Sequence, residues 1–222
     1  MIKITPKIEI LNKKNINGEE VLKTIEKVAR TCYKSEDKIT EQSAKNMVKN
    51  LIIRGHEAMI EFYDITVKLI CDRGITHEIV RHRVGSYAQE STRYCNYSMD
   101  KFNNQLTYID IYDGIMLDTK MKKYDVDKIN SIIEEWQKAC EDSEKHYLKM
   151  IELGATPQIA RSVLNNSIKT EINIKMNLRE WRHFFKLRAD KSAHPQMREV
   201  SLKLLKEFKK IIPIVFDDLD FE

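Results

Sequence analysis

The chain has 222 residues, of which 42% are hydrophobic and 32% charged, with a formal net charge of +4. This composition is typical of a globular protein, the length predicts a single domain over residues 1–222, and so mild a charge excludes nucleic-acid binding through the electrostatic field alone. The amino terminus has no signal-peptide pattern, and no apolar run approaches the roughly 20 residues of a transmembrane helix, so no membrane association is expected.

Hydrophobic periodicity predicts the elements of the first half of the chain. Ile65, Val67 and Leu69 alternate with polar residues, which indicates a strand. Thr40 is a suitable N-cap for a helix that ends before Gly55. The predicted elements of this half are helices over 19–34, 40–54 and 75–83, strands over 64–70 and 106–113, and a loop over 81–94.

The second half contains the cleanest patterns. In SIKTEINIKM, residues 167–176, Ile168 to Met176 alternate with charged residues and predict a strand, and Asn177 is placed to cap the helix that follows. The other predicted elements are helices over 125–153, 158–164, 178–190 and 195–210. Because helices and strands are mixed without regular βαβ alternation, the sequence predicts an α+β fold.

The arginines have an uneven distribution. Nine of the eleven fall into two blocks: Arg73, Arg81, Arg83 and Arg93, and then Arg161, Arg179, Arg182, Arg188 and Arg198. Guanidinium has a planar fork that pairs with phosphate or carboxylate in a way that ammonium does not. The blocks are interpreted as two halves of one anion site. The alternative is that these arginines make internal salt bridges.

The loop over 81–94, RHRVGSYAQESTRY, combines arginines with hydroxyl groups that can bind phosphate oxygens. His82 lies between two arginines in sequence, which disfavours its protonated form. A nucleic-acid-reading loop would use similar residues. However, Glu78 and Glu90 bracket the loop, which favours a small polar ligand over a polyanion.

The helix over 178–190 predicts two functional faces. Arg188 falls on the same side as Trp181, Phe184 and Phe185, where a guanidinium is costly unless it meets an anion or extends to water. Other residues of this helix, Arg179 and His183, share a second face at a spacing of i and i+4.

An ordered set of motifs covers nearly the whole chain. Arg81-His82-Arg83, seven residues and then Ser91 form an RHR-x7-S signature. Together with VARTCYKS (28–35), GHEAMIEF (55–62), IARSVLN (159–165), NLREWRHFFKLR (177–188) and AHPQMRE (193–199), it resembles the flavin-dependent thymidylate synthases, the ThyX family.

The resemblance implies a twisted, largely antiparallel sheet packed with long helices. It also implies reductive methylation of dUMP to dTMP, with 5,10-methylenetetrahydrofolate as the carbon donor and NADPH-reduced FAD as the hydride source. The expected assembly is a homotetramer with its sites where subunits meet. Two alternatives stay open: a flavin-binding relative without methylation activity, and an RNA-binding module.

The resemblance also assigns residues. Those expected to bind FAD are Arg81, His82, Arg83, Gln89, Asn177, Arg179 and His183. Those expected to bind dUMP are Glu78, Arg81, Gln89, Glu90, Ser91, Arg93, Arg161 and Arg188. Gln89 stands where many family members carry glutamate.

Arg188 is the expected catalytic group, which polarises the pyrimidine. Ser91 has no histidine–acid relay spaced around it, so we expect it to bind substrate rather than to attack it. The four cysteines, Cys32, Cys71, Cys95 and Cys140, form no CxxC pair, and we expect reduced thiols, no metal site and a cytoplasmic protein.

Overall fold

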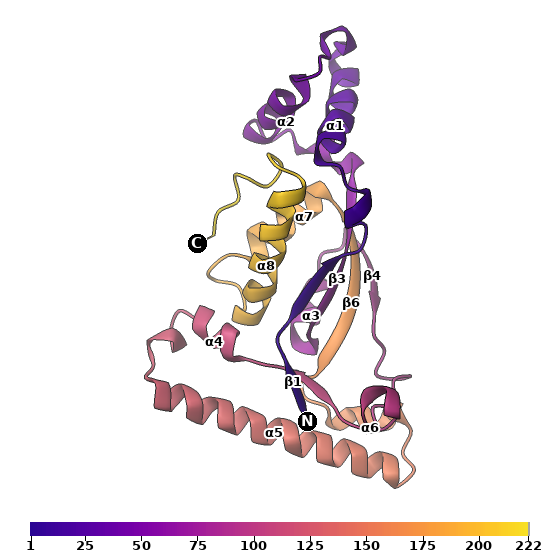
Figure 1. Ribbon diagram of the computed structural model, residues 1–222, viewed down its shortest axis with the longest axis vertical. Helices are drawn as coiled ribbons and strands as arrows, with labels where there is room; N and C mark the ends of the chain where they lie inside the picture. Colours follow the sequence, from indigo (N-terminus) through magenta and orange to yellow (C-terminus); the bar gives the residue numbers. More distant parts are fainter. Residues whose placement is uncertain (222) are drawn as a thin grey trace.

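A four-stranded antiparallel sheet forms the centre of the computed structural model, which describes residues 1–221 (Figure 1). Its strands lie in the order β2 (Lys7–Ile10), β3 (Asp64–Asp72), β6 (Lys169–Asn177) and β4 (Ser86–Gln89). A second, two-stranded sheet pairs β1 (Ile2–Ile4) with β5 (Thr107–Ile109) in parallel. The expected α+β fold with a largely antiparallel sheet is confirmed.

The two long central strands carry the alternation that the sequence predicts. In β3 and β6, Val67 faces Ile174 and Leu69 faces Ile172 across the ladder, and all four side chains are fully buried. Their face of the sheet packs against α7 (Leu178–Arg188) and α8 (Pro195–Ile211).

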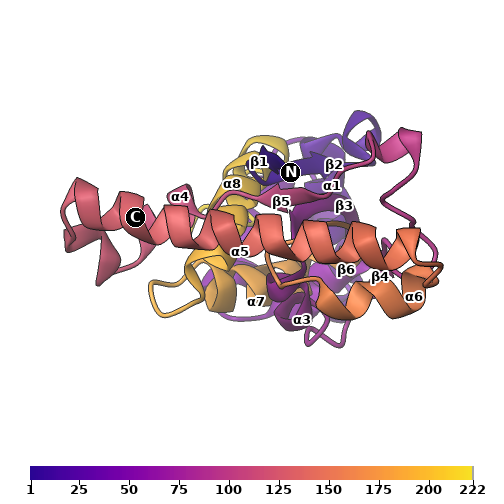
Figure 2. The same ribbon diagram turned by 90° about the horizontal axis from the view of Figure 1, so that it is seen from below.

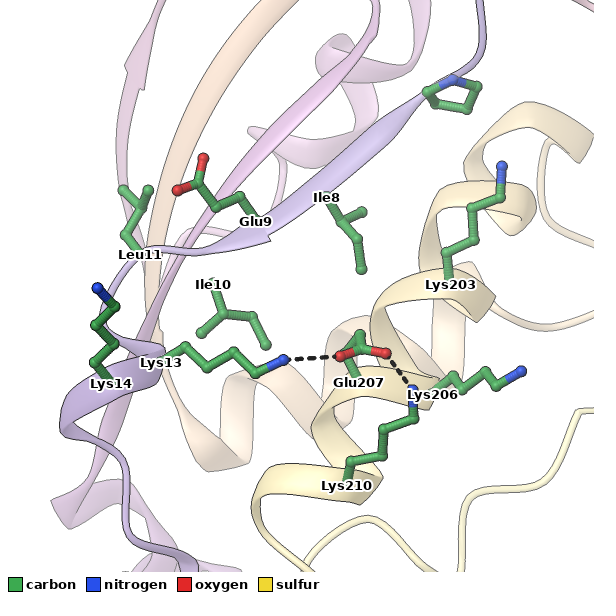
Figure 3. A pocket seen from close by; sticks show the side chains of 11 residues that line it. Ile8, Glu9, Ile10, Leu11, Lys13, Lys14, Lys203, Lys206, Glu207 and Lys210 are labelled. Carbon is green, nitrogen blue, oxygen red and sulfur yellow. Dashed lines mark hydrogen bonds and ion pairs between the residues drawn. The ribbon is translucent and has the colours of Figure 1, made fainter.

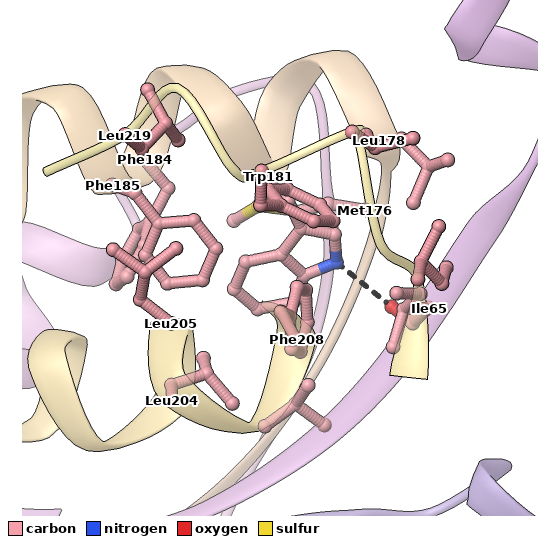
Figure 4. Close-up of a cluster of buried hydrophobic side chains, with 14 of the residues drawn as sticks. Ile65, Met176, Leu178, Trp181, Phe184, Phe185, Leu204, Leu205, Phe208 and Leu219 are labelled. Carbon is pink, nitrogen blue, oxygen red and sulfur yellow. Dashed lines mark hydrogen bonds between the residues drawn. The ribbon is translucent and has the colours of Figure 1, made fainter. Parts of the chain in front are cut away.

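An aromatic cluster fills the space between α7, α8 and the sheet (Figure 4). Trp181 packs edge-on against Phe184 and Phe208, and its indole N–H donates to the carbonyl oxygen of Ile65 at 3.1 Å. This bond satisfies the polar atom of a fully buried ring and fixes α7 against β3. Trp181, Phe184 and Phe185 therefore belong to the core.

The other helices lie at the two ends of the elongated molecule. At one end α1 (Gly18–Tyr33) packs against α2 (Ser43–Ile53), and at the other α5 (Val126–Glu152) crosses the base, with α6 (Pro157–Ala160) beside its C-terminal part (Figures 1 and 2). Two short helices complete the set, α3 (Arg73–Ile79) and α4 (Tyr112–Leu117). Within residues 1–221, none of the helices combines the length and apolar character needed to span a bilayer.

Local chemistry explains where the predicted boundaries are wrong. Helix α2 begins at Ser43 rather than after Thr40, because the Ser43 hydroxyl bonds to both backbone groups of Thr40 and holds it outside the helix. Helix α3 ends at Ile79, four residues earlier than expected. The predicted loop over 81–94 contains strand β4, because its backbone finds partners along β6.

Three further elements were not predicted at all: β1, β2 and α4. The first two are short strands, and β1 gains its hydrogen bonds only by pairing with β5, about a hundred residues further along the chain. The predicted helix over 158–164 is also shorter, because α6 passes into a 3-10 turn at Arg161.

A groove of about 1040 Å³ lies between β2 and α8 and is rimmed by lysines (Figure 3). Within residues 1–221, β2 pairs with β3 only, so its other side is a sheet edge. Lys13 from the segment after β2 and Lys210 from α8 both pair with Glu207. The lysines of this rim lie on α8 and on the turn after β2, so they place positive charge beside the sheet edge.

Candidate functional site

The junction between β6 and α7 presents several of the predicted residues together. Asn177 ends β6, and its side-chain oxygen accepts the backbone N–H of Glu180 at 2.8 Å, which caps α7 as predicted. The first turns of the helix then line a cavity of about 450 Å³. Its lining includes Asn177, Arg179 and His183, all expected at the flavin, together with Glu57, Glu61, Val84, Glu180 and Lys186.

Arg179 lines this cavity, and its guanidinium pairs with Glu61, which also lines it, at 2.6 Å. Both side chains are about half exposed. An ion pair exposed to water contributes little stability, typically less than about 1 kcal/mol. The guanidinium can therefore exchange this carboxylate for an anionic ligand at small cost.

His82 is a buried histidine that bridges two charged residues. Its Nδ1 lies 3.0 Å from Glu180 Oε1, and its Nε2 lies 3.2 Å from the Nε of Arg188. The arginine Nε–H can only donate, so Nε2 is the acceptor and Nδ1 carries the proton that bonds to Glu180. Phe184 and His183 flank the ring, at centroid distances of 5.1 and 5.5 Å.

Burial lowers the pKa of His82 below its ordinary value, and the nearby Arg188 charge lowers it further, while Glu180 acts in the opposite direction. This direction agrees with the neutral histidine predicted from the sequence. Its cause is different, because burial and Arg188 are responsible rather than the flanking Arg81 and Arg83, which are exposed.

Arg188 is tied to the protein by its whole guanidinium fork. Besides the bond to His82, Nη1 donates to Glu78 Oε2 at 2.5 Å and Nη2 donates to the Glu78 carbonyl at 3.2 Å. The expected position of Arg188 on the side of Trp181, Phe184 and Phe185 stays a prediction from helical spacing. At the last turn of α7 its guanidinium reaches the end of α3, and His82 contacts both Arg188 and Phe184. A guanidinium has five N–H donors, so two of them have no acceptor within residues 1–221.

The arginines of the segment over 81–94 point outward. Within residues 1–221, no acceptor or carboxylate pairs with the guanidinium groups of Arg81 and Arg83, and both are exposed. Arg93 is also exposed and stacks on Tyr94 at 5.4 Å. The Ser91 hydroxyl oxygen accepts the backbone N–H of Arg93 at 3.3 Å. This segment therefore presents free cationic groups on the surface.

A second cavity of about 470 Å³ lies beside the same segment. Arg161 lines it and donates to the Thr92 hydroxyl at 3.3 Å. Arg73 lines it too, and its Nη1 is buried with no hydrogen-bond acceptor among the residues that the structure describes. A buried donor left unpaired costs about 1–3 kcal/mol, which favours a ligand that supplies the acceptor.

Arg73 is not among the residues that the sequence predicts to bind a ligand, although it belongs to the first arginine block. Its position at the start of α3, directly after a buried strand, could have indicated a binding residue. Glu78, the anchor of Arg188, lies near the other end of the same helix. Five residues of α-helix span about 7.5 Å, so α3 separates the Arg73 cavity from Arg188 by a short distance.

Gln89 and Glu90, both predicted to bind ligands, form hydrogen bonds within the protein. Gln89 donates to the hydroxyl groups of Thr76 and Thr170, at 3.0 and 3.3 Å. Glu90 accepts a hydrogen bond from Tyr97 at 2.9 Å and pairs with Lys169 at 2.9 Å. Gln89 is the last residue of β4, and Glu90 follows it, with both backbones beside β6.

Not all arginines of the second block belong to an anion site. Arg182 is fully buried and pairs with Asp218 through both nitrogens of its fork, at 2.6 and 2.7 Å, and with Glu57 at 3.0 Å. Arg198 donates to the carbonyl oxygens of Ala189 and Phe221. For these two residues the internal-contact alternative is correct, and they fasten the C-terminal segment to α7 and α8.

Comparisons with known proteins agree with this geometry. A family model described as thymidylate synthase complementing protein matches residues 16–214. A flavin-dependent thymidylate synthase of Pyrococcus furiosus is 33% identical over 185 residues, 82% of this chain and 70% of that protein. The chain belongs to the flavin-dependent thymidylate synthase family. Another member, from Corynebacterium glutamicum, is 29% identical over 223 residues, 98% of this chain and 86% of the relative.

One solved structure shares the fold of this thymidylate synthase family member over nearly its full length. It is the UMP/dUMP methylase PolB from Streptomyces cacaoi bound with 5-Br dUMP, with a TM-score of 0.79 and 19% identity. The match covers 98% of this chain and 96% of that one.

The donors present fit the flavin that the family name implies. FAD carries a diphosphate and a ring with several hydrogen-bonding atoms. The unpaired guanidinium groups of Arg81 and Arg83 suit the diphosphate. The cavity lined by Asn177, Arg179 and His183 offers amide, guanidinium and imidazole groups.

Two features of this protein concern metal binding and thiol chemistry. His82, Glu180 and His183 present possible metal-ligand atoms within 4.8 Å of one another, although the Nε2 of His82 already accepts from Arg188. All four cysteines are free, and burial raises the pKa of the Cys95 thiol. A raised pKa disfavours the thiolate, which is the nucleophilic form of cysteine.

Proposed function

We propose that this protein converts dUMP to dTMP, with 5,10-methylenetetrahydrofolate as the carbon donor and FAD, reduced by NADPH, as the hydride source. Family membership supports the reaction type. The position of hydrogen-bond donors at the two ends of α3 supports dUMP as the substrate. At one end Arg73 has a buried, unpaired donor beside Arg161, and beyond the other end Arg188 has two remaining donors.

In this proposal, the dUMP phosphate binds in the cavity lined by Arg73, Arg161 and Thr92. Its oxygens supply the acceptor that Arg73 Nη1 lacks. The pyrimidine then extends along α3 toward Arg188, where a planar fork can meet N3 and O2 together. As negative charge grows on these atoms, the donors bind them more strongly than in the ground state, which accelerates the reaction. Glu78 and His82 keep the fork in place.

We assign the flavin to the cavity lined by Asn177, Arg179 and His183, with Arg81, His82, Arg83 and Gln89 completing its site. When bound, FAD supplies the hydride. The imidazole of His82 stays neutral in its buried position, so it contributes hydrogen bonds without adding positive charge next to Arg188.

Shared sites between subunits are part of the proposal. Arg81, Arg83 and Arg93 are exposed, while Arg161 and Arg188 are anchored inside the chain. We therefore propose a homotetramer in which the 81–94 segment of one subunit, with Glu90, Ser91 and Arg93, completes the dUMP site of another. Mixing inactive Arg83→Ala and Arg188→Ala proteins should restore part of the activity. A fully active monomer on light scattering would contradict the assembly.

We also propose that the whole of residues 1–222 acts as one domain in the cytoplasm, where the four cysteines stay reduced; residue 222 lies outside the described residues.

Tritium release from [5-³H]dUMP with methylenetetrahydrofolate, NADPH and FAD tests the function. We expect release that equals dTMP formation and depends on both cosubstrates. A yellow protein that oxidises NADPH but releases no tritium would be a flavin-binding relative without methylation activity. A colourless protein that binds RNA would contradict the proposal entirely.

A further inference from the structure

A chain of hydrogen bonds joins the first turn of α7 to its last residue through His82. Asn177 holds the backbone N–H of Glu180, the Glu180 carboxylate accepts from His82 Nδ1, and His82 Nε2 accepts from Arg188. Glu180 and Arg188 are eight residues apart on one helix, a rise of about 12 Å. The imidazole of His82 lies between the two side chains and bonds to both.

The geometry points to Glu180 as a positioning residue for Arg188. By accepting the Nδ1–H of His82, it fixes the tautomer in which Nε2 is an acceptor facing the Arg188 Nε–H. This inference rests on the proposed role of Arg188 at the pyrimidine. Glu180 itself is assigned no contact with dUMP.

Without the Glu180 carboxylate, His82 would no longer be restricted to the tautomer with its proton on Nδ1. Neutral imidazole carries its proton on either nitrogen, and the other form would place the His82 Nε2–H against the Nε–H of Arg188. Two donors facing each other cannot bond, so the guanidinium would lose one of its three anchors and become less well oriented. Glu78 alone would still hold Nη1 and Nη2.

Loss of the His82 anchor of Arg188 should lower turnover more than it weakens dUMP binding. The phosphate contacts assigned to Arg73 and Arg161 do not involve Glu180, so dUMP affinity keeps its main anchor. For Glu180→Ala we expect kcat to fall about 10-fold or more, on the scale seen when an orienting partner of a functional group is removed. The KM for dUMP should change by less than about threefold.

The decisive readout is the tautomer itself. Protein labelled with ¹⁵N-histidine is measured by long-range ¹H–¹⁵N correlation near pH 8, without substrates, and a His82→Asn variant identifies the His82 signals. We expect the Nδ1–H form in wild type and a mixture or the Nε2–H form in Glu180→Ala. In Glu180→Gln the amide oxygen can still accept, so the Nδ1–H form and most of the turnover should persist. Glu135→Ala, which removes a carboxylate from an exposed ion pair on α5, is the matched control.

Thermal unfolding of each variant separates misfolding from misorientation, and Glu180→Leu, which also removes the acceptor, replaces Glu180→Ala if the alanine variant does not fold. A His82 that keeps its Nδ1–H tautomer in Glu180→Ala would overturn the inference. A changed tautomer with unchanged kcat would overturn the link to Arg188 while leaving the proposed function intact. If wild type releases no tritium from dUMP, the proposed function has failed, and the tautomer experiment still decides whether Glu180 fixes His82.

Discussion

Replacing Arg188 with lysine keeps the charge and removes the fork. The guanidinium uses three nitrogens at once, for His82, the Glu78 carboxylate and the Glu78 carbonyl. An ammonium on a flexible stem cannot reach all three and also two atoms of a pyrimidine. The buried Nε2 of His82 would lose its donor, at a cost of about 1–3 kcal/mol. For a chain of this length, each kcal/mol lowers Tm by about 2–4 °C.

The effect on catalysis should be larger than the effect on stability. Loss of one preorganised donor typically lowers kcat by about 10²-fold, and we expect at least that for Arg188→Lys. FAD content should stay near wild type, because the flavin is assigned to other residues. NADPH oxidation without dUMP should also persist, since flavin reduction does not require this arginine.

The assay is tritium release from [5-³H]dUMP, combined with flavin absorbance and thermal unfolding on the same preparation. Arg54→Lys, an exposed arginine at the end of α2, is the matched control and should match wild type in all three. If Arg188→Lys lost its FAD while the remaining holoenzyme turned over normally, the assignment of Arg188 to the pyrimidine would be wrong.

Three other perturbations probe separate parts of the molecule. Arg73→Ala should lower kcat/KM for dUMP about 10-fold or more but leave the slow reaction of deoxyuridine unchanged; equal losses on both would refute a phosphate contact. Arg182→Ala should lower the free energy of unfolding in denaturant by about 1–3 kcal/mol, because the partly buried Glu57 and the half-exposed Asp218 lose their partner; a loss below about 1 kcal/mol would show that the pair is dispensable. His82 has a lowered pKa in the folded state, so its stabilisation is complete above about pH 6.5 and is lost as pH falls through the folded-state value. Tm should therefore drop on acidification, and less steeply in His82→Asn; parallel curves would contradict this.

The sequence predicts those parts of the fold in which local pattern and long-range packing agree. The alternation of β6 matches its buried face, and Asn177 caps α7, because both depend on residues that are neighbours in the chain. Strand β4 escaped prediction because its four residues, Ser86–Gln89, show no clear alternation and become a strand only beside β6.

The candidate site was predictable in its residue types but not in its connections. Arg179 and Arg182 lie on one helix, and only tertiary packing makes one an exposed cavity residue and the other a buried structural one. The helical stripe placed Arg188 with the aromatic residues, yet its partners come from a turn and a helix about a hundred residues earlier. Pairing over such distances leaves no periodic signal in the sequence.

A crystal structure of the protein with dUMP tests the assignment of the substrate most directly. The phosphate should lie within hydrogen-bonding distance of Arg73 and Arg161, with Arg73 Nη1 now paired. The pyrimidine should meet the two remaining donors of Arg188 while Glu78 and His82 keep their bonds to it. A phosphate bound elsewhere, with Arg73 Nη1 still lacking an acceptor and Arg188 far from the ring, would contradict the proposed site.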